Sequence, residues 1–161
     1  MPREPRRWSR LIGAVVALAL TALVVSVLAR GRALPDQPQP VAWNRQSCGH
    51  CRMLVGEPAH AAQLITGGGD VLFFDDPGCL LTYLDERAPA VHRMWFHDRA
   101  SERWLGPADV GFVAGATTPM GFGLAATDRT TAGALTLEQA RRHVAAARAM
   151  TDAGPGPGDP P

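Results

Sequence analysis

A long apolar run at residues 11–29 constrains this chain more than any other feature. No charged residue lies within it, and only Gly13, Thr21 and Ser26 interrupt its large apolar and alanine side chains. About 20 consecutive apolar residues are enough for a helix to cross a bilayer, so we expect residues 11–29 to form a transmembrane anchor. A cleaved signal peptide is the alternative, because Val27-Leu28-Ala29 resembles a small-residue cleavage site.

Basic residues are concentrated before this run. Arginines stand at positions 3, 6, 7 and 10 before it, and at 30 and 32 after it. The positive-inside rule then places residues 1–10 in the cytoplasm. The protein is therefore expected to be membrane-anchored, with its domain facing the periplasm or the cell exterior. Disulfides are possible there, but the chain has 3 cysteines, an odd number, so at least one thiol lacks an intramolecular partner.

The composition excludes several classes of protein. With 161 residues, of which 46% are hydrophobic, the chain can build one modest core or two very small ones. A net charge of +1 and an aromatic content of 6% do not suit a nucleic-acid partner. The sequence has no nucleophile elbow, no His-Glu-x-x-His motif and no phosphate-binding loop. We therefore expect that the protein is not an enzyme.

The Pro and Gly content divides the rest of the chain. Residues 30–46 are rich in proline and are predicted to form an extended linker. Residues 151–161 are predicted to be a disordered tail, because they consist largely of Gly and Pro. The folded domain is expected at residues 47–150.

A hairpin followed by a helix is predicted in the first half of the domain. Strands at residues 60–66 and 71–74 flank a glycine-rich turn. Asp76 is a suitable N-cap for a helix, and Pro77 suits its first position. Residues 91–97 alternate in a way that fits a strand with one face buried.

The same order recurs in the second half. Extended segments are expected at residues 109–114 and 122–127, and a helix at residues 137–150. Thr136 and Gln139 have the spacing of a capping box for that helix. The pattern favours an α+β fold of two hairpin-plus-helix units, with one continuous sheet as the alternative.

The segment Cys48-Gly49-His50-Cys51-Arg52-Met53 carries the clearest chemistry. Thiolate and thioether sulfur are soft ligands that favour copper(I). If residues 51–53 are extended, Cys51 and Met53 point to the same side, and a turn at residues 49–50 brings Cys48 to them.

Redox and zinc chemistry are the alternatives for this motif. Zinc needs two further Cys or His ligands, which the sequence does not offer at a suitable spacing. A thiol-disulfide redox pair of Cys48 and Cys51 remains open, although Gly56 and Pro58 disfavour the helix that such a motif usually opens.

Two further sulfurs and one imidazole are candidate ligands. Cys79 falls in the first turn of the first helix of the domain, where the helix dipole favours a thiolate; otherwise it is a small buried apolar residue. Met120 lies between glycines in a loop and can reach the motif only if that loop folds over the first unit. We favour Met120 over Cys79 for copper contact. His50 could also ligate.

These segments together resemble the NosL family, copper-binding accessory proteins of nitrous oxide reductase maturation. The matching stretches are Cys48-Gly-His-Cys51-Arg-Met53, Phe74-Asp-Asp-Pro-Gly-Cys79-Leu80, Trp104-Leu-Gly-Pro-Ala108 and Thr118-Pro-Met120-Gly-Phe-Gly123. The resemblance implies two small linked β-β-α-β units behind the N-terminal transmembrane helix. It also implies one copper(I) bound by Cys51 and Met53, and a metallochaperone that delivers copper to a client cuproenzyme, nitrous oxide reductase or an oxidase.

The chain departs from the family in two places. The family motif usually reads Cys-Gly-Met, and here Arg52 occupies the middle position. Many relatives carry a lipid-bearing cysteine just after the apolar segment, whereas the first cysteine here is Cys48. A protein anchor would therefore replace the lipid. An exported thiol-disulfide protein remains the alternative function.

Overall fold

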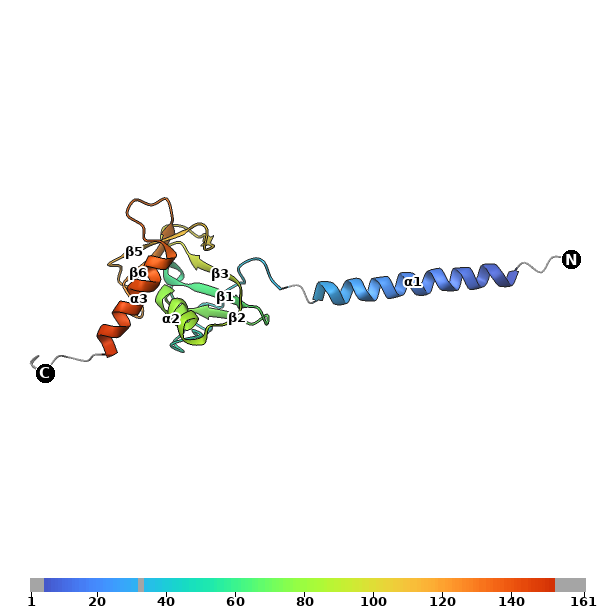
Figure 1. Cartoon of the computed structure of the whole chain (residues 1–161), viewed down its shortest axis with the longest axis horizontal. Coiled ribbons are helices and arrows are strands. Elements are labelled where there is room, and N and C mark those ends of the chain that lie inside the picture. Colours follow the sequence, from blue (N-terminus) through green and yellow to red (C-terminus); the bar gives the residue numbers. More distant parts are fainter. Residues whose placement is uncertain (1–4, 32–33, 153–161) are drawn as a thin grey trace, which may run out of the picture. The chain divides into compact units, whose positions relative to one another are not determined.

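The N-terminal helix forms, but the predicted membrane span is not confirmed. The computed structural model describes residues 5–31 and 34–152 (Figure 1). The chain divides into two compact units at Leu34 and Pro35, of which the first contains α1, Pro5–Gly31. A span needs about 20 consecutive, predominantly apolar residues. Over the residues that the structure describes, no helix is both long enough and apolar enough to cross a bilayer.

The predicted linker and tail are only partly described. From residue 34 to residue 46 the chain forms no helix or strand. Gln39 nevertheless contacts the domain: its N–H donates to Gln63 Oε1, and Gln63 Nε2 donates to its carbonyl oxygen, both at 2.8 Å. This end of the proline-rich segment therefore packs on the domain. Of the predicted tail, residues 153–161 lie outside the described residues.

The first half of the domain forms a four-stranded antiparallel sheet of order β2-β1-β3-β4. Its strands are β1 (Ala62–Thr66), β2 (Val71–Phe74), β3 (Val91–His97) and β4 (Trp104–Leu105). The predicted hairpin of β1 and β2 is confirmed. Strand β1 begins later than predicted because Pro58–His60 form a short 3-10 helix, η1.

Helix α2, Pro77–Arg87, begins as the sequence predicts. Asp76 Oδ1 accepts a hydrogen bond of 2.7 Å from the Gly78 N–H, and Pro77 occupies the first position, where no N–H is needed. The helix ends at Arg87 and is followed by Ala88, which adopts the left-handed conformation. Its first six residues are buried, so this N-terminal end is fixed in the core.

The second half forms a separate two-stranded sheet and one helix. Strands β5 (Val110–Ala114) and β6 (Leu124–Asp128) pair antiparallel. Helix α3, Leu137–Asp152, carries the predicted capping box: the Thr136 N–H donates to Gln139 Oε1 at 2.8 Å, and the Gln139 N–H donates to Thr136 Oγ1 at 3.2 Å. The two sheets show that one continuous sheet was the wrong alternative.

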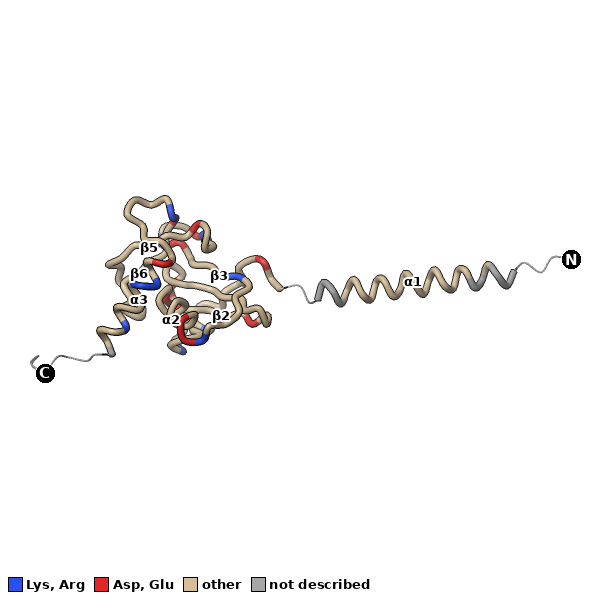
Figure 2. Tube along the Cα trace, in the orientation of Figure 1, with Lys and Arg blue, Asp and Glu red and all other residues tan. Residues whose placement is uncertain are grey.

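The two halves pack into a single α+β domain. The rings of Phe96 in β3 and Phe112 in β5 meet edge to face at 5.0 Å, and α2 and α3 lie side by side, with Arg148 pairing with Glu86 (Figure 1). Acidic and basic residues are scattered over the domain (Figure 2). The first half has the expected β-β-α-β order. The expectation for the second half was wrong, because within residues 34–152 no strand follows α3.

Candidate metal centre

The cysteine motif forms a tight hairpin at residues 47–54. Ser47 and Leu54 form an antiparallel bridge. The Cys48 N–H donates to the Met53 carbonyl at 2.7 Å, and the Arg52 N–H donates to the Cys48 carbonyl at 3.2 Å. Residues 51–53 are therefore not extended, so the condition under which strand alternation would place Cys51 and Met53 on one side is not met.

Arg52 is the residue that reverses the chain. Its φ of 68° lies in the left-handed region, where a side chain costs about 1–2 kcal/mol and glycine is free of that cost. A glycine at this position, as in the motif that the sequence resembles, would avoid that cost. Here the same turn forms with an arginine, whose charged side chain is exposed next to Cys51.

Backbone contacts fix the hairpin to strand β2. The Gly49 N–H donates to the Phe73 carbonyl at 2.7 Å, and Cys48 and Phe73 form a parallel bridge. On the other arm, the Gly56 N–H donates to Asp75 Oδ1 at 3.0 Å. Because β2 leads directly through Asp75 and Asp76 into α2, the hairpin lies against the first turn of that helix.

Three sulfur atoms converge at this junction. The Sγ atoms of Cys48, Cys51 and Cys79 all lie within 4.8 Å of one another. Cys48 and Cys79 are fully buried, whereas Cys51 is only partly buried. The structure thus brings Cys79 of α2 to the two cysteines of the hairpin, and one of the three sulfurs lies close to solvent.

The three thiols differ in acidity. The pKa of Cys48 is lowered to about 4, mainly because its sulfur accepts a hydrogen bond from the Cys79 thiol. Burial opposes this shift, and hydrogen bonds from the backbone N–H groups of Asp75, His50 and Cys51 add to it. The hydrogen bond to Cys48, and then burial, raise the pKa of Cys79. Burial raises the pKa of Cys51. At neutral pH the cluster therefore holds one thiolate, at Cys48, and two thiols.

Of the two alternatives for Cys79, the structure favours a small buried residue over a thiolate, because its side chain is fully buried and its pKa is raised. The N-terminus of α2 does favour negative charge, but the sulfur lies in a buried site beside the Cys48 thiolate, and both effects oppose a second charge. Sequence reasoning saw the helix end but not the neighbouring thiolate, which comes from a segment about 30 residues earlier.

The two methionines occupy different surroundings. The Met53 side chain is 52% exposed on the hairpin. Met120 is partly buried, and its N–H donates to Asp76 Oδ2 at 3.2 Å. The loop that carries Met120 thus does fold over the first unit, onto the start of α2, as its proposed role requires. The assignment of either methionine as a ligand stays a prediction.

His50 lies outside the group of sulfurs. Its Nδ1 is 3.8 Å from Glu86 Oε2 near the end of α2. Among the described residues, the one group of three or more Cys, His, Asp or Glu side chains that converge closely enough for a metal is Cys48, Cys51 and Cys79.

Comparisons with known proteins give one similar structure to report. No protein-family model matches the chain, and no curated protein does. Among solved structures, the chain is similar to the copper chaperone NosL from Shewanella denitrificans, with 20% sequence identity and a TM-score of 0.49. The match covers 70% of this chain and 88% of that one.

Proposed function

We propose that this chain is an extracytoplasmic copper(I) metallochaperone that binds the ion between Cys48, Cys51 and Cys79 and passes it to a client cuproenzyme. The observation that carries the proposal is the convergence of three Sγ atoms within 4.8 Å at the junction of the hairpin and α2. Nitrous oxide reductase is the client that the motif resemblance implies. The copper is cargo, and no catalytic role is proposed for the chain.

The donor set favours copper(I) over zinc. Thiolates are soft ligands, and copper(I) accepts a small number of them. Structural zinc sites are almost always four-coordinate, yet within the described residues no His, Asp or Glu joins the three cysteines. Met53 and Met120 are proposed as additional thioether donors, which again suit copper(I) better than zinc.

Unequal burial of the sulfurs suits a carrier. Cys48 and Cys79 hold the ion from the buried side, and the partly buried Cys51 leaves a side open to the ligands of an acceptor. Burial raises the pKa of Cys51, so the free sulfur regains a proton at neutral pH once the ion leaves. Reprotonation opposes rebinding and therefore favours release.

A redox role for Cys48 and Cys51 is the second candidate. A thiolate of lowered pKa beside a second thiol is what disulfide exchange requires. The two proposals differ over Cys79, which a redox pair does not need and a copper site does. A disulfide between Cys48 and Cys51 that turns over rapidly with a thiol reductant, in a chain that does not retain copper, would favour the redox role.

Copper(I) titration of the reduced chain against a chromophoric chelator tests the proposal. We expect one copper per chain, bound more tightly than zinc. Between about pH 5 and 8 Cys48 is already ionised, while the raised pKa values keep Cys51 and Cys79 protonated. Binding by all three sulfurs must therefore release two protons, and the affinity should fall about 100-fold for each unit by which the pH falls.

Two outcomes of this titration contradict the proposal. Tighter binding of zinc than of copper would overturn the choice of metal. An affinity that does not change with pH would mean that Cys51 and Cys79 keep their protons. The ion would then be held by the Cys48 thiolate and thioethers alone.

The extracytoplasmic location is proposed from the sequence, because more arginines stand directly before the apolar run at 11–29 than directly after it. A phosphatase that is active only outside the cytoplasm, fused after Gln46, should be active. Activity of a cytoplasm-only reporter at the same position would overturn the location without affecting the metal site.

A further inference from the structure

Exposed apolar side chains gather beside the sulfur cluster. Outside α1, the described part of the chain exposes five large hydrophobic side chains: Trp43, Met53, Leu54, Val91 and Met150. Three of them belong to the hairpin region, with Trp43 36% exposed and Met53 and Leu54 each 52% exposed. Exposed apolar groups that cluster in this way mark interaction sites more often than isolated ones do.

The backbone holds these side chains in one region. The Asn44 N–H donates to the Val55 carbonyl at 2.9 Å, which places the turn containing Trp43 and Arg45 against the second arm of the hairpin. Arg45 and Arg52 are also exposed. Neither makes an ion pair with another described residue, and the same is true of Arg87, Arg99 and Arg129, whereas Arg93, Arg103 and the arginines of α3 are paired. We call Trp43, Arg45, Arg52, Met53 and Leu54 the hairpin tip.

We propose that the hairpin tip is the docking face for the protein that accepts the copper, and that the acceptor presents an apolar surface ringed by carboxylates around its own soft-metal site. This inference rests on the proposed function and adds the chemistry of the partner. Aromatic residues, Met and Arg are enriched in protein interfaces. Arg45 and Arg52 lie beside the exposed apolar side chains, and they are the groups that an acidic rim would neutralise.

The position of the hairpin tip relative to the sulfurs supports this assignment. Arg52 and Met53 follow directly after Cys51, the least buried of the three cysteines. A partner that covers the hairpin tip therefore brings its ligands to the sulfur that solvent can reach. Opposite charge speeds such encounters by about 10- to 1000-fold at low ionic strength, and added salt reduces the effect.

An aromatic copper(I) chelator with negative charges reproduces the proposed partner chemistry. Disulfonated bathocuproine is a suitable probe, and its coloured copper complex reports transfer from the copper-loaded full chain in a stopped-flow experiment. We expect Arg45→Glu combined with Arg52→Glu to slow the second-order transfer about tenfold at low salt. Added salt should slow transfer from the wild type and speed transfer from this variant.

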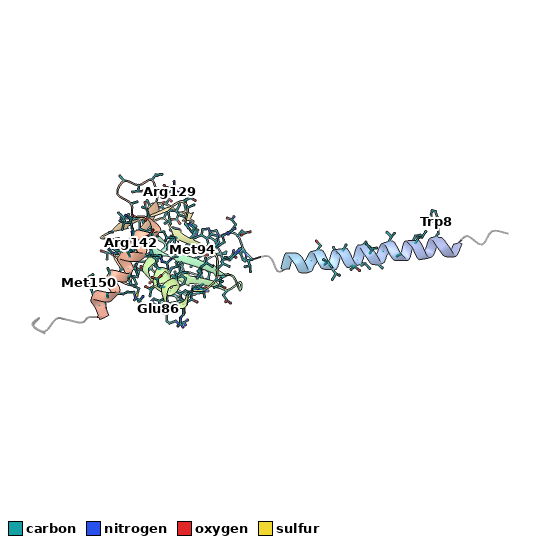
Figure 3. The ribbon with its side chains drawn as sticks, in the orientation of Figure 1. Trp8, Glu86, Met94, Arg129, Arg142 and Met150 are labelled. Atoms are coloured by element: carbon teal, nitrogen blue, oxygen red, sulfur yellow. The ribbon has the colours of Figure 1, made fainter. Side chains whose placement is uncertain are left out.

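A second pair of reversals supplies the matched control. Arg129→Glu combined with Arg142→Glu changes the net charge equally, but on the second half of the domain (Figure 3). We expect its transfer rate to stay within about twofold of the wild type. The neutral double variant Arg45→Gln and Arg52→Gln should give an intermediate rate. It replaces the charge-reversed variant in the test if the charge reversal impairs folding. The equilibrium copper affinity is measured for each variant, because tighter binding of copper would also slow the transfer.

Three results would overturn the inference. If both charge-reversed double variants lose the same amount of transfer rate, the cause is the net charge of the chain and not the hairpin tip. A rate that does not depend on chelator concentration would mean that copper leaves before any encounter. Concentration-dependent dimerisation that Leu54→Ser abolishes, detected by light scattering, would assign the hairpin tip to a second copy of the chain. If the wild type takes up no copper, the proposed function itself fails, and this inference fails with it.

Discussion

Replacing Cys48 by serine is expected to lower the copper(I) affinity of the chain by at least about 100-fold. Loss of a group that only supports a metal ligand typically lowers the metal affinity 10- to 100-fold. Cys48 is proposed as a ligand itself, so its loss should cost at least as much. It is the sulfur that the hydrogen bond from Cys79 and the backbone N–H groups of Asp75, His50 and Cys51 stabilise as a thiolate. Serine has nearly the same shape but stays protonated. Competition with a chromophoric chelator measures the change.

The remaining ligands are ranked by the same measurement. Cys79→Ser and Cys51→Ser should each cost more affinity than Met53→Leu or Met120→Leu, because a thiolate carries charge and a thioether does not. Met150→Leu is the matched control, since Met150 is 71% exposed on α3. X-ray absorption should count three sulfur neighbours or more. A larger loss in Met120→Leu than in Cys79→Ser would restore the ligand ranking that the sequence favoured.

Local signals predicted most of the elements. The cap of α2 depends on Asp76, Pro77 and Gly78, and the capping box of α3 on Thr136 and Gln139. The β1–β2 hairpin depends on a turn of four residues. Each of these arrangements is decided within a few residues, so the sequence contains all the information that it requires.

The metal centre could be predicted only in part. The motif identified Cys48 and Cys51, but the conformation of residues 51–53 depends on Arg52, a residue that rarely adopts positive φ. Cys79 joins them because the hairpin pairs with β2 at Phe73. No local pattern encodes that pairing. The choice between a thiolate and a buried thiol at Cys79 was open for the same reason, since the neighbour that most raises its pKa, Cys48, is distant in sequence.

Gly78→Ala is expected to destabilise the domain by about 1–3 kcal/mol, the usual cost of overpacking a filled site. In an open helical position alanine would instead be favoured by roughly 1 kcal/mol. Here a Cβ at Gly78 would lie 2.3 Å from Phe122 Cγ and 2.6 Å from Phe122 Cβ. These atoms are close to the backbone of Phe122, so a change of rotamer cannot remove the overlap. The loop that carries Met120 must move off α2.

Urea unfolding with a matched glycine and a double variant tests this contact. Gly106→Ala is the control, because a Cβ there would meet no atom within 4 Å, and it should leave the stability unchanged or raise it slightly. Phe122→Ala alone should also destabilise, because it removes a partly buried ring. In the double variant the two effects should be clearly less than additive, because Phe122→Ala removes the ring that the new methyl group meets. Additive losses, or equal stabilities of Gly78→Ala and Gly106→Ala, would show that Phe122 does not hold the Met120 loop on the helix end that carries Cys79.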